Sequence, residues 1–351
     1  MLSVSASQTG DRFSGPYDVI VVGAGISGVV AADHMSRAGL SVLVLERRKR
    51  LGGRCATRSI EGGVFDYGAQ YFTIRYPAFQ ELAYHWQQNG SARIWSFGFS
   101  YADGVVERPG HPRWYGTNGM RWLVESLVKG FETRCGDGAQ RIMEQRGGWK
   151  VETASGLVFE SKAVLLALPI PLAIRLISDE DTWKFGAAMA PLLAVTYDPC
   201  IAAMLVLEGP SGLPAPGGVR VEDQGIAWIA DNRMKGISPA MDAITVLADR
   251  AFSLELLEED PDVAAARIAE RAAPFLESRP QAVSGYRWRY ASPGRLLSSE
   301  YFELYGRAPL LFAGDAFCDG KMEGAVLSGL AAARRLVDLV EDTRLKPLGR
   351  K

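Results

Sequence analysis

The sequence has few of the residues that build metal sites and disulfide frameworks. It holds three histidines and four cysteines in 351 residues. The cysteines (Cys55, Cys135, Cys200 and Cys318) are scattered and form no Cys-x-x-Cys pair. This spacing disfavours a zinc site or a disulfide framework and is typical of reduced thiols. We therefore expect no bound metal, and we expect a cytoplasmic protein.

The sequence also lacks an excess of charge and a long apolar run. Lys and Arg together number 39 and Asp and Glu 40, for a formal net charge of −1. This balance argues against a nucleic acid as partner. No apolar run approaches the roughly 18 residues of a membrane span. Residues 1–16 lack the apolar stretch of a signal peptide, and we interpret them as a flexible tail.

What the sequence does contain is a dinucleotide-binding pattern near its start. Residues 17–22 are a short apolar run rich in β-branched side chains, typical of a buried parallel strand. A Gly-x-Gly-x-x-Gly motif follows over 23–28, then a helical pattern, then a strand over 41–45 that ends at Glu46. In this order the glycines permit a tight turn, close approach of a pyrophosphate and close packing of helix on strand. Glu46 is placed to accept hydrogen bonds from a ribose.

Further segments favour FAD over NAD as the cofactor. Residues 50–54 (RLGGR) place two adjacent glycines and an arginine beside the expected pyrophosphate. Near the C-terminus, a buried strand over 309–313 leads into Gly314-Asp315 and then into a helix that begins near Glu323. The positive end of that helix is suited to stabilise the negative charge that hydride transfer leaves on a flavin.

These segments resemble the renalase family, a branch of FAD-dependent oxidoreductases related to amine oxidases and phytoene desaturases. The resemblance is carried by residues 50–54, 66–73 (DYGAQYFT), 286–291 (YRWRYA) and 314–329 (GDAFCDGKMEGAVLSG). It implies an α/β fold: a Rossmann-type FAD-binding domain with a parallel sheet, and a second α+β substrate domain on an antiparallel or mixed sheet. The expected boundaries are 17–80, 116–175 and 285–345 for the discontinuous FAD-binding domain, and 81–115 and 176–284 for the substrate domain.

The resemblance also implies non-covalently bound FAD and a set of residues that contact it. The predicted FAD-binding residues are Gly23, Gly25, Ser27, Gly28, Glu46, Arg47, Gly53, Arg54, Gln70, Tyr71, Ile142, Asp315, Glu323, Gly324, Ala325 and Val326.

Three residues are candidates for the substrate pocket. Gln70 follows the turn that should pass near the flavin, where it would bond to flavin or substrate; the alternative is a turn residue satisfied by its own backbone. Trp288 and Tyr290 alternate on an expected strand, and form either a wall for a flat substrate or ordinary core. One segment, 248–256, departs from the renalase-like pattern in the substrate sheet, which leaves the substrate open.

The predicted function is that of a renalase-like oxidase. It would oxidise isomeric dihydronicotinamide dinucleotides by hydride transfer to flavin N5, with molecular oxygen as acceptor, giving NAD(P) and hydrogen peroxide. Hydride transfer of this kind needs stacking and exclusion of water but no general base. The alternatives are an amine oxidase or desaturase that acts on a small metabolite, and a flavin-bound regulatory protein without turnover.

Overall fold

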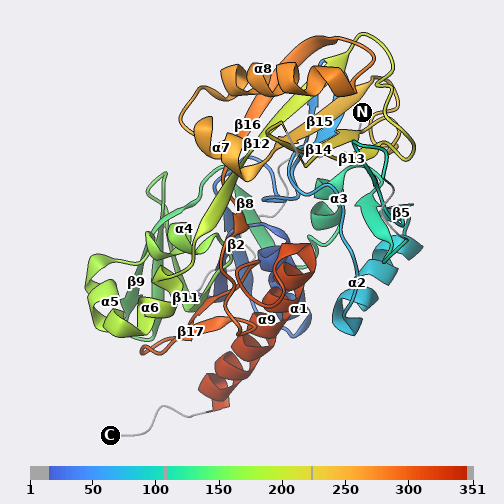
Figure 1. Ribbon diagram of the computed structural model, residues 1–351. Helices are drawn as coiled ribbons and strands as arrows, with labels where there is room; N and C mark the ends of the chain where they lie inside the picture. Colours follow the sequence, from blue (N-terminus) through green and yellow to red (C-terminus); the bar gives the residue numbers. More distant parts are fainter. Residues whose placement is uncertain (1–15, 106–108, 223, 346–351) are drawn as a thin grey trace, which may run out of the picture.

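A computed structural model describes residues 16–105, 109–222 and 224–345 of the chain. Residues 1–15 of the expected tail lie outside this range. The chain forms two lobes, each built on its own sheet (Figure 1). The fold is the predicted α/β arrangement, with a mainly parallel sheet in one lobe and a mainly antiparallel sheet in the other.

The first lobe is built on an eight-stranded sheet around the N-terminal strand. Its main path runs β17 (Phe302–Leu304), β18 (Leu310–Phe312), β11 (Val158–Leu166), β1 (Tyr17–Val22), β2 (Val42–Glu46) and β8 (Glu132–Cys135). The pairings from β18 to β8 are parallel, and β17 joins antiparallel. The hairpin of β9 (Ala139–Gln145) and β10 (Gly148–Thr153) attaches to β11.

The two faces of this sheet are covered by different helices because alternate strand residues point to opposite sides. Val19 and Val21 of β1 face a core shared with α1 (Ile26–Arg37), α2 (Pro77–Gln88), α3 (Met120–Glu125) and α9 (Lys321–Leu345). Ile20 and Val22 face the other core, which is covered by α4, α5 and α6. These short helices span Ile170–Ile174, Asp179–Phe185 and Ala190–Leu193, and the 3-10 turn between the last two spans Gly186–Met189.

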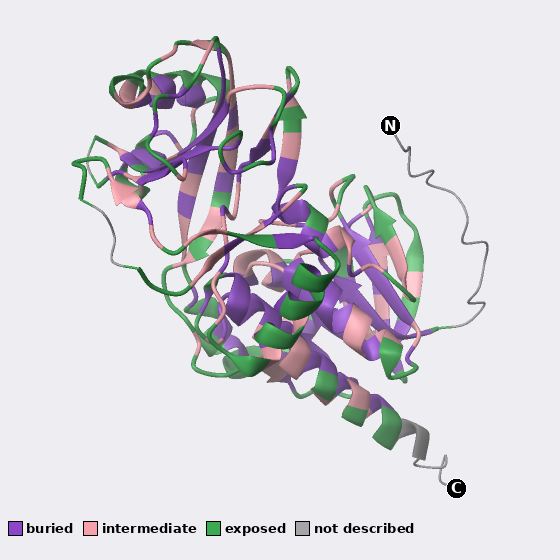
Figure 2. Cartoon of the chain, turned by 90° about the vertical axis from the view of Figure 1, so that its right-hand side faces the viewer, coloured by how far each residue is buried: buried purple, intermediate pink, exposed green. Residues whose placement is uncertain are grey.

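The second lobe is a six-stranded sheet. Its order is β16 (Pro280–Pro293), β12 (Tyr197–Leu207), β15 (Ala243–Ala248), β14 (Ile226–Asp231), β13 (Gly218–Arg220) and β6 (Ser100–Tyr101). One face is covered by α7 (Arg250–Glu255) and α8 (Pro261–Ala272), which a 3-10 turn (Ala273–Phe275) follows. The other face packs on the hairpin of β3 (Thr57–Ile60) and β4 (Gly63–Asp66), which follows β2 of the first lobe in the sequence. Both sheets are largely buried, and the exposed residues gather on the outer sides of helices and in loops (Figure 2).

Two local sequence patterns predict structure that the chain does not form. The aromatic alternation at Trp95, Phe97, Phe99 and Tyr101 is typical of one continuous strand, but the chain forms β5 (Ala92–Ser96), which pairs with β7 (Arg113–Gly116), and then the separate β6. Phe97 turns outward and Phe99 is buried against the second sheet, so the pattern reflects packing on two different partners.

The second pattern concerns the cap of α3. Thr117 or Asn118 is the expected cap from the sequence, but the N-cap is Gly119, and no side chain of its own accepts a bond there. Instead the distant Asp66 accepts from the backbone N–H of Met120 at 2.8 Å. A helix can be capped by any well-placed acceptor, and sequence spacing reveals only local ones. No helix within the described ranges is long and apolar enough to cross a bilayer.

The contact between α1 and α9 gives the first testable prediction. A Cβ on Gly329 of α9 would lie 2.4 Å from the backbone oxygen of Ser27. We expect Gly329→Ala to separate the helices and to lower the free energy of unfolding by about 1–3 kcal/mol, as overpacked cores do. Thermal unfolding checks this, with Asp338→Ala at an exposed position of the same helix as control. An unchanged midpoint for Gly329→Ala would contradict the close packing.

Candidate active site

The glycine loop between β1 and α1 leaves an open space at the start of the helix. A Cβ on Gly23, where φ is +106°, would lie 2.6 Å from the backbone oxygen of Ala167, and one on Gly28 would lie 2.1 Å from the oxygen of Gly23. A Cβ on Gly25 would meet no atom within 4 Å. Two of the glycines are therefore required by packing, whereas Gly25 borders an open cradle beside the positive end of α1.

Ser27 provides a polar atom without a partner at the same place. Its side chain is buried, and its Oγ has no hydrogen-bond partner within the described residues. A buried hydroxyl without a partner is costly, so a ligand oxygen beside Gly25 would satisfy it. The cradle and this hydroxyl together fit the pyrophosphate of the predicted FAD.

The loop over residues 50–54 packs directly on the glycine loop. The N–H of Gly52 donates to the oxygen of Ala24 at 2.9 Å, and a Cβ on Gly53 would lie 3.1 Å from Cα of Gly25. Glu46, at the end of β2, accepts from the N–H groups of Ala24 (3.0 Å) and Arg48 (2.8 Å). Glu46 thus helps to fix the conformation of the loop. A contact of Glu46 with a ribose, and a contact of the exposed Arg47 with FAD, stay predictions.

Arg54 connects this loop to the C-terminal motif. Its guanidinium donates two bonds of 2.6 Å to the two carboxylate oxygens of Asp315, and further bonds to the backbone oxygens of Tyr290 (3.3 Å) and Ala291 (3.2 Å). A bidentate pair of this kind fixes both position and orientation. A Cβ on Gly314 would meet nothing within 4 Å, so a second open space adjoins this ion pair. The pair brings together the N-terminal and C-terminal parts of the predicted FAD site.

The start of α9 lies against the segment that follows residue 70. Glu323 accepts from the N–H groups of Arg75 (2.6 Å) and Tyr76 (2.9 Å), and Gly324, Ala325 and Val326 are buried behind it. The helix begins at Lys321, close to the predicted start. Ile142, by contrast, lies on β9 in the core of the opposite sheet face, where its N–H bonds to the oxygen of Leu176.

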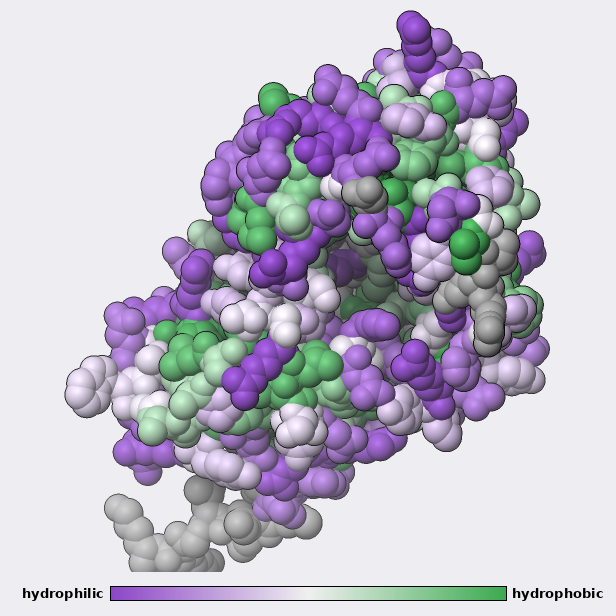
Figure 3. Space-filling model, in the orientation of Figure 1, coloured by the Kyte–Doolittle hydropathy of each residue, from purple (hydrophilic) through white to green (hydrophobic). Residues whose placement is uncertain are grey.

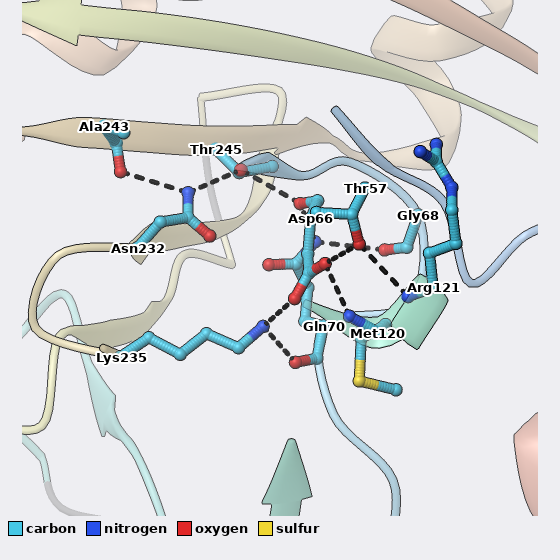
Figure 4. A network of polar contacts seen from close by, with 10 residues as sticks. All are labelled: Thr57, Asp66, Gly68, Gln70, Met120, Arg121, Asn232, Lys235, Ala243 and Thr245. Atoms are coloured by element: carbon cyan, nitrogen blue, oxygen red, sulfur yellow. Dashed lines mark hydrogen bonds and ion pairs between the residues drawn. The ribbon is translucent and has the colours of Figure 1, made fainter. Parts of the chain in front are cut away.

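Gln70 lies in a buried polar network between the two lobes (Figure 4). Its Nε2 donates to the backbone oxygens of Asp66 (2.7 Å) and Gly68 (3.0 Å), and its buried Oε1 has no partner within the described residues. The turn thus satisfies the amide nitrogen of Gln70, as the second alternative expects. A bond from its amide oxygen to flavin or substrate stays a prediction.

The centre of this network is an ion pair that sequence reasoning missed. Lys235 Nζ lies 2.6 Å from Asp66 Oδ2 and 2.6 Å from the backbone oxygen of Gln70, and both side chains are 0% exposed. The other carboxylate oxygen of Asp66 accepts from Thr57 Oγ1 (2.5 Å) and from the N–H of Met120 (2.8 Å). Burial lowers the pKa of Lys235, while Asp66 counteracts this shift. Lys235 lies in a polar stretch (DNRMKG) that begins at the last residue of β14, and nothing in that stretch distinguishes a buried lysine from a solvated one.

Trp288 and Tyr290 lie on β16, as predicted, but they face structural neighbours. Trp288 Nε1 donates to the oxygen of Tyr67 at 2.7 Å, and the two rings stack at 5.4 Å. Tyr290 meets Tyr197 edge-on at 5.9 Å. Arg289, on the same strand, pairs with Glu258 at 2.7 Å.

Four aromatic side chains form a cluster near the start of the segment that follows Gln70. It consists of Tyr71, Trp95, Phe99 and Trp228, with ring centroids 4.8–6.0 Å apart. Two arginines lie on its rings, Arg113 5.7 Å from the ring centre of Tyr71 and Arg220 5.9 Å from that of Trp228. Arg220 also donates to the hydroxyl of Tyr71 at 3.0 Å. We call these six residues the aromatic–arginine cluster. Figure 3 shows the surface hollowed between the two lobes.

The cysteines beside these motifs are poor nucleophiles. Burial raises the pKa of Cys55 to about 12 and that of Cys318 to about 11. A thiol that stays protonated is inert. The structure is therefore consistent with the prediction of a cofactor bound without a covalent bond.

Comparison with known proteins gives two family matches. The sequence model of the family described as "Flavin containing amine oxidoreductase" matches residues 96–337, and that of an NAD(P)-binding Rossmann-like domain matches residues 21–86. Among curated proteins, pseudooxynicotine dehydrogenase from a Pseudomonas species is 35% identical over 113 residues, which are 32% of this chain and 19% of that protein. Putrescine oxidase from Kocuria rosea is 43% identical over 56 residues, 16% of this chain and 12% of that protein. The chain thus matches less than a fifth of the length of either relative.

Solved structures show the same fold. A putrescine oxidase bound to putrescine superposes with a TM-score of 0.65 at 16% identity, covering 92% of this chain and 99% of that one. A fatty acid isomerase from P. acnes superposes with a TM-score of 0.67 at 13% identity, with the same coverage. At these identities the likeness establishes the fold alone.

The unpartnered hydroxyl at the cradle gives the second prediction. We expect Ser27→Ala to weaken FAD binding about fivefold to thirtyfold, the effect of losing one hydrogen bond to a charged group. The thermal stability of the apoprotein should change little, since no bond within the described residues is lost. Fluorescence titration of apoprotein with FAD measures the affinity. Ser36→Ala on the same helix, which loses only a bond to the oxygen of Gly130, is the control; equal affinities in both variants would contradict the assignment.

Proposed function

The chain belongs to the family of flavin-containing amine oxidoreductases, and from that premise we propose that it is an FAD-dependent oxidase of dihydronicotinamide dinucleotides. The substrate class is the one that the resemblance to the renalase family implies. Two electrons and a proton leave the dihydropyridine ring together as hydride, and molecular oxygen then takes two electrons and two protons to give hydrogen peroxide. The products are NAD(P) and hydrogen peroxide.

The residues around the glycine loop fit FAD. The cradle at Gly25 and the hydroxyl of Ser27 are suited to the pyrophosphate, and the loop of Gly53 and Arg54 closes on them. Asp315, fixed by Arg54, would hold the ribityl chain, and the start of α9 would face the flavin ring. When bound, FAD supplies the acceptor for hydride.

The aromatic–arginine cluster is the observation that carries the choice of substrate. Phe99 and Trp228 are buried, whereas Tyr71 and Trp95 are partly exposed. Partly exposed rings of this kind favour a flat heteroaromatic substrate by stacking. Guanidinium groups have several N–H donors in a fork that suits phosphate oxygens. A dihydronicotinamide dinucleotide has a flat ring and a pyrophosphate, and so matches both features. A cationic amine would instead meet two positive charges at this wall.

The protein's own residues would bind and orient the substrate and exclude water from it. Lys235, the ammonium group of the buried network, is already bonded to a carboxylate and a carbonyl oxygen, so it is not placed to accept a proton from a substrate. This suits a substrate that loses hydride without a separate proton transfer. The buried position of Gln70 keeps the unpartnered amide oxygen away from water.

The second candidate is oxidation of a small amine. It is favoured by the curated names of the relatives, a pseudooxynicotine dehydrogenase and a putrescine oxidase. The aromatic rings of the cluster would also enclose an uncharged amine.

Anaerobic reduction of the flavin separates the candidates and gives the third prediction. Purified protein is mixed without oxygen with an NADH preparation enriched in ring isomers, with pure NADH, or with simple amines, and the visible flavin band is followed. We expect rapid bleaching by the isomer-containing preparation only, followed by hydrogen peroxide when oxygen is admitted. Bleaching by an amine would favour the second candidate. Tightly bound FAD that no compound reduces would point to a protein without turnover.

Arg220 gives the fourth prediction. We expect Arg220→Ala to raise the KM for a dinucleotide substrate about tenfold, because a charge-assisted bond is worth about 1.5 kcal/mol. Since the residue binds phosphate in this proposal, the KM for a truncated dihydronicotinamide mononucleoside should stay within twofold. Steady-state kinetics with both substrates measure this. Arg250→Ala, which breaks an exposed pair with Asp198, is the control; an equal loss with both substrates would contradict a phosphate contact.

A further inference from the structure

We propose that Lys235 is a positioning residue: together with Asp66 it holds the turn over residues 66–70 so that Gln70 Oε1 faces the bound ring as a hydrogen-bond acceptor. The partner is an uncharged N–H donor on a flat heteroaromatic ring. Such a donor occurs on the ring of FAD itself and on the carboxamide of a nicotinamide. The second source rests on the proposed function, whereas the first does not.

The orientation of the Gln70 amide is fixed by what surrounds its nitrogen. Nε2 has two N–H groups, and two backbone oxygens lie within hydrogen-bond distance of it, those of Asp66 at 2.7 Å and of Gly68 at 3.0 Å. An amide oxygen in the same place would oppose two other oxygens, so the nitrogen must occupy it. The remaining atom, Oε1, can only accept.

This acceptor is buried and has no partner in the described part of the chain. Gln70 is 6% exposed, and no donor of residues 16–105, 109–222 or 224–345 reaches its Oε1. A buried amide oxygen left without a donor costs free energy. The atom is therefore suited to a donor that arrives with a ligand, and the site selects a ligand that offers an N–H at this point.

Lys235 controls where this acceptor lies because it bonds to both ends of the turn. Its ammonium has three N–H groups. Two are directed to Asp66 Oδ2 and to the backbone oxygen of Gln70, each at 2.6 Å, and the ammonium lies 4.9 Å above the ring centre of Trp95. Figure 4 shows the two bonds from Lys235 to Asp66 and Gln70. With its protons directed to these groups and to the ring, Lys235 has none to spare for a substrate. Its effect on the reaction must pass through the turn.

The same contact makes the acceptor depend on the arrangement of the lobes. Lys235 lies in the segment between β14 and β15, in the second lobe, whereas Asp66 is the last residue of β4 and Gln70 follows that strand. Thr245 of β15 adds a third connection, since its Oγ1 donates to the backbone oxygen of Asp66 at 3.0 Å. Asn232, at the start of the segment, in turn donates to Thr245 Oγ1 at 3.0 Å. The acceptor is thus aligned only when the second lobe is seated on the turn.

The test compares two variants, one single and one double, that should act alike. Gln70→Met removes the acceptor. The double variant Lys235→Met with Asp66→Asn removes the positioning pair without leaving one buried charge alone, which a single substitution would do. Arg233→Ala is the matched control, because Arg233 lies in the same segment but forms an exposed pair with Asp242. Thermal unfolding and FAD content are recorded for each variant first, and Gln70→Met alone tests the acceptor if the double variant does not fold.

Two readouts distinguish the source of the donor. If the flavin provides the N–H, its midpoint potential should shift in Gln70→Met and in the double variant by about 30 mV, a tenfold change for two electrons. If the substrate carboxamide provides it, the potential should stay constant. The KM for the carboxamide substrate should then rise about tenfold, whereas the KM for its 3-acetyl analogue, which lacks the N–H, should not change.

Each remaining outcome counts against the proposal. A Gln70→Met variant with unchanged potential and unchanged KM would show that Oε1 meets no donor. If the potential or the KM changed in Gln70→Met but not in the folded double variant, Lys235 would not be the residue that positions Gln70 Oε1. The midpoint potential is measured without substrate. If no dinucleotide reduced the flavin, the proposed function would be overturned, but a hydrogen bond from the flavin to Gln70 could still be tested by the potential. An equal shift in Arg233→Ala would show a general effect of the segment.

Discussion

The ion pair between Lys235 and Asp66 is the interaction on which the junction of the two lobes depends. Both side chains are fully buried, and the bond is 2.6 Å long. Two charges withdrawn from water are stable only if every remaining polar atom finds a partner, and removal of one member of such a pair costs about 3–5 kcal/mol. Asp66 meets that requirement with Thr57 and the N–H of Met120. One carboxylate therefore connects the β3–β4 hairpin, the first turn of α3 and the segment that contains Lys235.

The predicted cofactor site is subject to a different constraint, because it is assembled from the two ends of the chain. The cradle at Gly25 is formed near the N-terminus, yet α9 must return from the C-terminus to lie against α1. Two contacts make this possible: the bidentate pair of Arg54 with Asp315, and the absence of a side chain at Gly329, which lets α9 approach the backbone of Ser27. The second lobe is inserted between these two parts of the first. Its position is therefore set by contacts such as the Lys235 pair rather than by chain connectivity.

Features that depend on residues close together in the sequence could be predicted, whereas features that depend on residues far apart could not. The βαβ unit, the buried strand before Gly314 and the helix after it depend on local patterns, and all were predicted from sequence. The cap of α3 does not follow from a local pattern, because Asp66 lies far away along the chain. The aromatic alternation at 95–101 does not indicate one strand, because its residues pack on two different partners. The buried position of Lys235 could not be predicted from the sequence. A lysine in a polar stretch is normally solvated, and only the fold shows that its acceptors are buried.

The protons of this network bear on the chemistry that the site can perform. An oxidation that removes a proton in a separate step needs a side chain with a free lone pair near the substrate. The charged side chains nearest Gln70 do not offer one: Lys235 is bonded to two oxygens, and both oxygens of Asp66 accept bonds from the protein. The atom that is left, Gln70 Oε1, is an uncharged acceptor of low basicity. It can align an N–H donor but cannot take up the proton. Under the proposed function, such a site would suit a substrate that gives up hydride directly, and it would contribute alignment rather than acid–base catalysis.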